Sequence, residues 1–187
     1  HVSQHSFPTR RSSDLYAVHN AHAPQPEISR FDGGLSQLLQ GTGRGEFTVV
    51  EPAESGLIVT GDAKALVVTD LDADGWPDFV ITRNNAATVA FRNQGVAGRS
   101  TVRIALRGST GNATAIGARV TVELADGTTQ TGEITAGGGY WSQSSAALHF
   151  GFCKANPPRE IRVVWPDGQR TTHACNGTPP SITLTRP

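Results

Sequence analysis

Several features that would point to a membrane, nucleic-acid or catalytic protein are missing from this 187-residue sequence. No apolar run approaches the roughly 20 residues that a membrane-spanning helix needs, so we expect no membrane span. Neither half carries a cluster of Lys and Arg of the kind that binds phosphates, so we expect no nucleic-acid partner. The chain also has no methionine and begins at His1. We therefore expect a fragment or a processed product, from which any signal peptide and any preceding domain have been removed.

The sequence also has no overall excess of positive or negative charge, because its formal net charge is zero. The distribution is uneven, however. Residues 16–95 hold five Lys and Arg against ten Asp and Glu, whereas residues 96–187 hold nine against five. The acidic part would repel itself unless a positive group lies among its carboxylates.

Catalytic motifs are absent as well. The sequence has no G-x-S-x-G, H-E-x-x-H or C-x-x-C pattern. His149 alternates with apolar neighbours, which is typical of a strand residue, and His173 has no evident partner in the sequence. Trp165 precedes a turn and is expected in the core. We do not expect an enzyme.

Cysteine is scarce, with Cys153 and Cys175 alone. A secreted protein could join them, but sequence does not show whether the two sulfur atoms meet. A disulfide and a pair of buried free thiols both remain open.

What the sequence does contain favours β structure. It has 21 Gly and 11 Pro, and its apolar runs are short and rich in Val, Ile and Thr. Strand candidates between turn residues indicate consecutive hairpins up to residue 95. These candidates are 35–41, 46–51, 65–70, 78–83 and 87–93.

Alternation is cleaner beyond residue 96. "TVRIALR" (101–107) places Val102, Ile104 and Leu106 on one face, as in a half-buried antiparallel strand. About seven such strands in roughly 90 residues predict an antiparallel β-sandwich over 96–187, with a boundary near Val96–Ser100. The remaining candidates are 118–124, 129–135, 147–152, 160–165, 169–174 and 181–185. The stretches "ADGT" (125–128) and "WPDG" (165–168) predict tight turns at Gly127 and Gly168.

The stretch "SFPTRRSSDL" (6–15) resembles the translation of a DNA-sequencing adapter. The resemblance implies that residues 1–15 are an artefact and do not belong in an argument about the fold. We expect no packed structure up to about residue 25 and a disordered tail over 1–30, since 21–26 is also linker-like. The tail histidines are not expected to bind metal; they are His1, His5, His19 and His22.

The stretch "TDLDADGWPD" (69–78) crowds four carboxylates between two apolar strands. Gly75 permits the backbone to curl so that the carboxylates converge. Hard oxygen ligands in this number suit Ca²⁺, which takes roughly 6–8 oxygens, whereas an unneutralised cluster would repel itself. We predict a calcium site whose ligands are Asp70, Asp72, Asp74, Asp78 and the main-chain carbonyl of Trp76.

An EF-hand is excluded, because the position that needs a Glu is Ile81. The spacing D-x-D-x-D-G-x-x-D between strands resembles the calcium loop of FG-GAP/VCBS repeats. This resemblance implies that residues 31–95 are the last part of a β-propeller. A propeller needs roughly 4–8 blades, so it also implies that upstream blades are missing from this chain.

A second resemblance rests on "AIGARVTVE" (115–123), "AGGGYWSQSS" (136–145), "LHFGF" (148–152) and "IRVVWPDGQ" (161–169). In order and spacing these stretches resemble the ASPIC/UnbV domain over about residues 100–175. That domain follows VCBS repeats in secreted proteins similar to cartilage acidic protein 1, many of them bacterial. The resemblance implies an extracellular or cell-envelope location.

Together these features predict an all-β fragment that acts as a non-catalytic, calcium-stabilised adhesion or interaction module. Its partner would be a protein or glycan at the cell surface. An alternative is a carbohydrate-binding module in which Tyr140 and Trp141 stack on a sugar, flanked by Gln143. The competing hypothesis is that this loop folds back and buries its aromatic rings.

Overall fold

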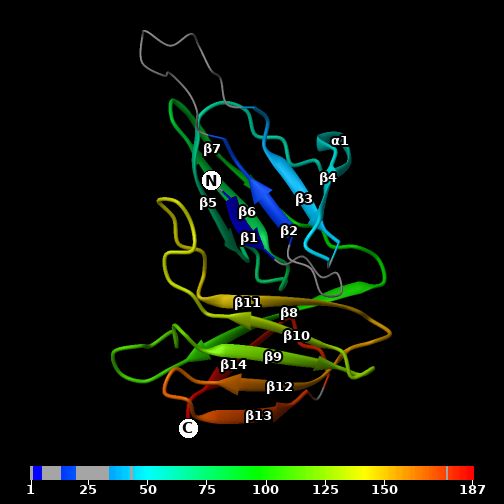
Figure 1. Cartoon of the computed structure of the whole chain (residues 1–187), viewed down its shortest axis with the longest axis vertical. Coiled ribbons are helices and arrows are strands. Elements are labelled where there is room, and N and C mark those ends of the chain that lie inside the picture. Colours follow the sequence, from blue (N-terminus) through cyan, green and yellow to red (C-terminus); the bar gives the residue numbers. More distant parts are fainter. Residues whose placement is uncertain (1, 6–13, 20–33, 43, 176) are drawn as a thin grey trace.

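The computed structural model describes residues 2–5, 14–19, 34–42, 44–175 and 177–187. Over these residues the protein is nearly all β: it has fourteen strands and one four-residue helix, α1 (Pro52–Ser55). The strands form two groups, an N-terminal half with β1–β7 and a C-terminal half with β8–β14 (Figure 1). No helix among the described residues is long and apolar enough to cross a membrane.

The N-terminal half contains two sheets. The first is antiparallel with the order β1-β2-β3-β4, and the second is a meander, β5-β6-β7. All five strand candidates up to residue 93 are confirmed, and both β5-β6 and β6-β7 are hairpins, as predicted. The strands are β1 (Val2–His5), β2 (Asp14–Ala17), β3 (Gln37–Gly41), β4 (Phe47–Val50), β5 (Ala63–Thr69), β6 (Asp78–Arg83) and β7 (Ala86–Phe91).

The prediction that residues up to about 25 have no packed structure is wrong where the structure describes them. β1 pairs with β2, and Tyr16 and Val18 are 1% and 4% exposed. The Tyr16 ring lies 5.1 Å from that of Phe79 on β6. The apolar run Leu15–Val18 was not predicted as a strand, because the adapter resemblance set residues up to 15 aside and left only three of its residues. Most of the adapter-like stretch (6–13), the linker-like stretch (21–26), His1 and His22 lie outside the described residues.

The two N-terminal sheets share one core. Apolar side chains of β2 pack against those of β5 and β6, with Val59 from the connection between the sheets. Burying such side chains is the main favourable contribution to folding. The buried cluster consists of Tyr16, Val18, Val59, Ala63, Leu66, Val68, Phe79 and Ile81.

The C-terminal half also has two sheets, with the orders β10-β9-β12-β13 and β11-β8-β14. The hairpin turns predicted around Gly127 and Gly168 are confirmed, and both glycines have the positive φ that such turns need. The strands are β8 (Arg99–Arg107), β9 (Arg119–Leu124), β10 (Thr129–Glu133), β11 (Ala147–Cys153), β12 (Pro158–Val164), β13 (Arg170–Ala174) and β14 (Ser181–Thr185).

One pairing differs from the predicted antiparallel arrangement. β14 runs parallel to β8, with Ser181 opposite Arg103 and Thr185 opposite Arg107. Alternation explains the error, because it specifies which face a residue occupies and not the direction of the strand. Ile182 and Leu184 pack on the core in this direction as they would in the other.

Both C-terminal sheets contribute to a second core cluster. The predicted face of β8 is confirmed, since Val102, Ile104 and Leu106 are at most 4% exposed. Trp165 lies in the core as expected, and its indole N–H donates to Thr171 Oγ1 at 3.0 Å. In addition to the three β8 residues, the cluster contains Ala115, Ala118, Val120, Val122, Leu124, Ile134, Phe150, Phe152, Ile161, Val163, Trp165 and Leu184.

The two cysteines are free thiols in this fold. Of the two open alternatives, the disulfide is therefore not formed, and the pair of buried thiols does not hold either, because Cys153 at the end of β11 is exposed. Cys175 is partly buried, and burial raises the pKa of its thiol.

Candidate functional site

The predicted acidic loop connects β5 to β6, directly beyond the closing strand pair of Thr69 and Asp78. Two residues in the loop have positive φ, Ala73 at 61° and Gly75 at 88°. These left-handed positions reverse the chain within a few residues. The expectation that the backbone curls at Gly75 is therefore confirmed.

Asp70 organises the turn through main-chain hydrogen bonds. Its Oδ1 accepts from the amide of Asp74 at 3.1 Å, and its Oδ2 accepts from the amide of Gly75 at 3.0 Å. Such bonds fix the orientation of the side chain. Each oxygen keeps a second lone pair that points away from the amide.

Asp78 is the fully buried member of the loop, with 0% of the residue exposed. Its Oδ2 accepts from the amide of Leu71, and its Oδ1 accepts from the amide of Asn93, both at 2.8 Å. The side chain therefore ties the loop to the segment that follows β7. A buried carboxylate needs such partners, because an unpaired one is strongly destabilising.

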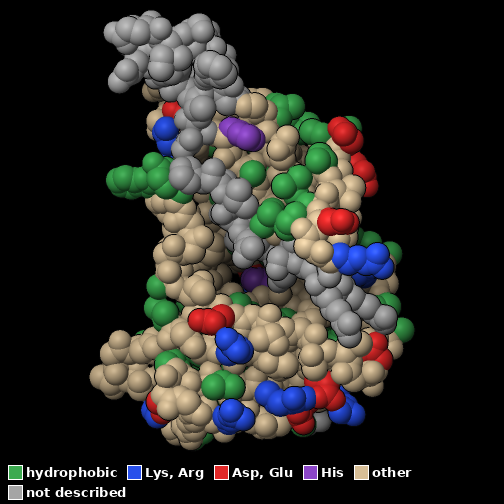
Figure 2. All heavy atoms as spheres, in the orientation of Figure 1, with side chains coloured by type: hydrophobic (Ala, Val, Ile, Leu, Met, Phe, Trp, Pro, Cys, Tyr) green, Lys and Arg blue, Asp and Glu red, His purple; other side chains and the backbone are tan. Residues whose placement is uncertain are grey.

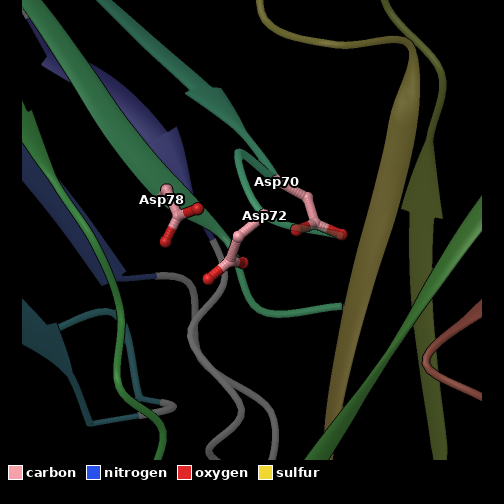
Figure 3. A group of neighbouring side chains, drawn as sticks. All are labelled: Asp70, Asp72 and Asp78. Atoms are coloured by element: carbon pink, nitrogen blue, oxygen red, sulfur yellow. The ribbon is translucent and has the colours of Figure 1, made fainter. Parts of the chain in front are cut away.

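Asp72 is exposed and forms an ion pair in which Arg92 Nε lies 2.6 Å from its Oδ2. Asp70, Asp72 and Asp78 each bring one carboxylate oxygen within 4.8 Å of the others. Figure 3 shows Asp70 at the end of β5, Asp78 at the start of β6 and Asp72 between them. This is the one group of three or more His, Cys, Asp or Glu with such spacing in the described part of the chain.

The other two predicted ligands are not part of this group of side chains. Asp74 Oδ1 accepts from the amide of Trp76 at 2.8 Å. The Trp76 indole lies against the main chain at Gly95, where a Cβ would come within 2.9 Å of the ring, and the ligand role of the Trp76 carbonyl stays a prediction. The structure thus brings three of the four predicted carboxylate ligands together.

The donor set fits a hard divalent cation. All three converging groups offer oxygen, which suits Ca²⁺ and Mg²⁺ better than softer metals. Main-chain amides already orient Asp70 and Asp78, so little rearrangement is needed to present their remaining lone pairs. The larger and less directional coordination sphere of Ca²⁺ tolerates an irregular set of this kind better than that of Mg²⁺.

Three contacts of the loop were missed by sequence reasoning, which considered only the nine-residue pattern. Arg92 and Asn93 follow β7, and no local spacing connects them to the loop. His149 is more distant still: its Nδ1 lies 3.1 Å from the carbonyl oxygen of Gly75. Because a carbonyl oxygen only accepts, Nδ1 carries the proton. The pattern that predicted a strand residue at His149 was correct but did not reveal this partner.

Burial lowers the pKa of His149, and the hydrogen bond to Gly75 offsets part of this effect. Nε2 of the ring is buried and has no hydrogen-bond partner among the described residues. The neutral ring therefore fits the environment, since a charged ring would place a second N–H there without an acceptor.

The aromatic loop between β10 and β11 differs from the hypothesis that its rings are buried. Trp141 is 83% exposed and Tyr140 is 42% exposed. The two rings are 6.1 Å apart at an angle of 77°, so they meet edge to face and do not form one flat platform. Trp141 has a positive φ of 50°, a conformation that is uncommon for a bulky residue.

Gln143 holds this loop together. Its Oε1 accepts from the amide of Gly137, and its Nε2 donates to the carbonyl of Ser144 at 3.0 Å. Its amide group is thus engaged within the loop. Among the three predicted sugar-contacting residues, the structure presents the two aromatic rings to solvent.

Comparison with curated proteins gives no match. Comparison with protein families gives one match, which agrees with the second resemblance noted from the sequence. The matched segment covers less than half of the 187 residues. It begins within the loop after β8 and includes β9 to β14. Residues 108–185 match the family model described as ASPIC and UnbV.

Proposed function

We propose that the chain is a non-catalytic, calcium-stabilised interaction module from a larger secreted protein of the type that resembles cartilage acidic protein 1. The observation that carries the proposal is the convergence of Asp70, Asp72 and Asp78 in a loop whose main chain already orients two of them. In this proposal the bound ion neutralises the carboxylates and rigidifies the turn between β5 and β6.

The sheets of the N-terminal half support an origin in an FG-GAP/VCBS propeller. Two antiparallel sheets stack through a shared apolar core, as adjacent blades do. On the outer strand β4, Phe47 and Val49 are 45% and 53% exposed. Exposed apolar side chains on an edge strand suit a further sheet of the same protein as neighbour. In the C-terminal half the two sheets around one core fit a β-sandwich.

The role as an interaction module rests on the sequence, which contains none of the catalytic motifs considered above and carries the two family resemblances. Its expected location outside the cell or in the cell envelope rests on the sequence resemblances. There Ca²⁺ is abundant enough to fill weak sites, with dissociation constants up to about 10⁻³ M.

Calorimetric titration of the full chain with CaCl₂ tests the calcium site. Asp72→Asn is the most informative variant, because Asp72 is exposed and its removal leaves the main-chain bonds of the loop in place. We expect it to weaken Ca²⁺ binding at least about ten-fold. Asp126→Asn, in the β9-β10 turn, is the matched control and should bind as the wild type does. Equal binding by the Asp72 variant, or no binding by the wild type, would contradict the proposal.

A second candidate function is favoured by the exposed ring of Trp141. An aromatic side chain that is 83% exposed and held by a well-bonded loop is suited to stack on a sugar ring. A glycan array with the full chain tests this candidate. Trp141→Ala should abolish any specific signal, whereas Leu71→Ala, at another exposed apolar side chain, should retain it. Signal that survives the loss of Trp141 would exclude this function.

A further inference from the structure

The tip of the acidic loop contacts the C-terminal half. The carbonyl of Gly75 accepts from His149 Nδ1 on β11 at 3.1 Å. On its other side, a Cβ added at Gly75 would lie 2.6 Å from the carbonyl oxygen of Pro180, just before β14. Only glycine allows this approach, both because of the space and because of its φ of 88°.

The residues that Gly75 contacts on the C-terminal half belong to one hydrogen-bonded sheet. The carbonyl of Pro180 accepts from the amide of Arg103 at 2.9 Å, and Arg103 on β8 is the register partner of His149 on β11. His149, Arg103 and Pro180 therefore occupy neighbouring positions on one sheet, whose order is β11-β8-β14. We call these three residues the seat of Gly75.

A second contact lies at Val68, one residue before Thr69, which pairs with Asp78 at the base of the acidic loop. β5 is an edge strand, since its sheet has the order β5-β6-β7. The carbonyl of Val68 on β5 accepts from the amide of Ser145, and the amide of Val68 donates to Ser144 Oγ, both at 3.1 Å. Figure 1 shows this segment between β10 and β11 rising beside β5. Residues 144–149 thus hold both the strand that enters the acidic loop and the turn at its tip.

A direct path of bonds connects the seat to the carboxylates. The amide of Gly75 donates to Asp70 Oδ2 at 3.0 Å, while the carbonyl of the same residue accepts from His149. A cation bound by Asp70 would fix this carboxylate and, with it, the Gly75 turn. Docking of Gly75 on its seat would in turn hold Asp70 in the orientation that binds the cation. Such coupling is reciprocal by thermodynamic necessity.

We propose that the acidic loop is a metal-responsive joint between the two halves, in which Ca²⁺ binding and docking of Gly75 on the seat reinforce each other. This inference rests on the calcium site of the proposed function. His149 is a positioning residue in it and does not contact the ion. Bound Ca²⁺ stabilises the C-terminal half as well as the loop, and loss of the His149 donor weakens Ca²⁺ binding by about five-fold, the worth of one typical hydrogen bond.

Fluorine NMR of the full chain labelled with 5-fluorotryptophan tests the joint, because each tryptophan reports on a different place. Trp76 lies in the loop and Trp165 in the C-terminal core. In thermal unfolding, the native signals of both should disappear in one transition, and CaCl₂ should raise its midpoint for both. In His149→Ala the two signals should separate, and CaCl₂ should then shift Trp76 alone.

Two further variants distinguish the seat from a general loss of stability. His149→Asn keeps a donor close to the position of Nδ1, so it should restore both the common transition and the Ca²⁺ affinity. Gly75→Ala should uncouple the signals, whereas Gly61→Ala should not. Gly61 has a similar φ of 81° but has no neighbouring atom within 4 Å of an added Cβ.

The outcomes separate the joint from the calcium site. If CaCl₂ raises the unfolding midpoint of the Trp76 signal in the wild type but not that of the Trp165 signal, the calcium site is correct and the proposed joint is wrong. If CaCl₂ shifts neither signal, the calcium site is wrong and the metal-responsive joint falls with it. If the two signals of the wild type already melt apart without metal, or if His149→Ala binds Ca²⁺ as the wild type does, the joint is overturned.

Discussion

The two halves of the molecule are built from similar alternating strands, yet they differ in how many apolar side chains they bury and in what stabilises them. The C-terminal half buries fifteen apolar residues in one cluster, whereas the described residues of the N-terminal half bury eight. In Figure 2 hydrophobic side chains gather on the visible face of the N-terminal half, while most of the basic ones lie over the C-terminal half. The C-terminal half is therefore stabilised mainly by its apolar core. The N-terminal half depends in addition on the hydrogen bonds and the ion pair of its carboxylates.

The strongest test of the comparison is to open the larger core. Ile161→Ala on β12 removes a side chain that is 1% exposed and leaves a cavity, which we expect to destabilise the C-terminal half by about 2–5 kcal/mol. Urea denaturation followed by the fluorine signal of 5-fluorotryptophan at Trp165 would measure this loss. Val96→Ala, at an exposed apolar residue, is the control and should change stability by less than about 0.5 kcal/mol. A similar loss in both variants would show that the core is not closed.

The corresponding test of the N-terminal half removes a charge, not an apolar side chain. Asp78→Ala leaves the amides of Leu71 and Asn93 without their acceptor. A buried donor without a partner costs about 1–3 kcal/mol, so we expect a loss of about 3 kcal/mol for the pair. Denaturation monitored at Trp76 would report it, with Asp126→Ala as the exposed control. If Asp78→Ala is as stable as this control, the carboxylates do not hold the N-terminal half together.

A smaller effect is expected from the basic side chain in the acidic loop. Arg92→Gln breaks an exposed ion pair with Asp72, which should lower stability without metal by at most about 1 kcal/mol. Because a positive charge is removed beside the carboxylates, Ca²⁺ should bind several-fold more tightly. Calorimetry would show this increase. Arg83→Gln, whose Nε donates to the carbonyl of Ala87, removes the same charge elsewhere. Weaker binding in Arg92→Gln would mean that Arg92 supports the site and does not compete with the cation.

The smallest effect is expected at the aromatic loop. Trp141→Gly relieves the positive φ of 50° but increases the entropy of the unfolded chain, so the two contributions should nearly cancel. Because the ring is 83% exposed, little packing is lost, and the unfolding midpoint should change by less than about 3 °C. Thermal unfolding by circular dichroism would check this. A drop of about 10 °C or more would contradict this prediction and indicate that the ring contributes to packing.

Sequence reasoning succeeded where the information was local. The alternation of Val102, Ile104 and Leu106 gave the correct buried face, and the turns at Gly127 and Gly168 gave the correct hairpins. The glycine in the acidic loop likewise predicted its curl. In each case the physical cause lies within a few residues of its effect.

It failed where the partner is far away in the chain. The parallel pairing of β14 with β8 joins residues nearly 80 positions apart, and the bond between Gly75 and His149 spans 74. Neither leaves a periodic pattern. Tyr16 illustrates the same limit, since only the stacked sheets show that its ring packs on Phe79. Trp141 was open between two alternatives, because its exposure depends on how the loop between β10 and β11 folds.

The parallel pair of β8 and β14 has a mechanical consequence. The chain enters the C-terminal half directly into β8 at Arg99 and leaves it through β14, and these strands are neighbours with five paired positions. A tensile force between the N-terminal half and residues beyond β14 would pull the two strands past each other along their length. The force would then act in shear on all the hydrogen bonds between the two strands at once, and these bonds would not break one after another. The topology therefore suits a tether that has to resist stretching.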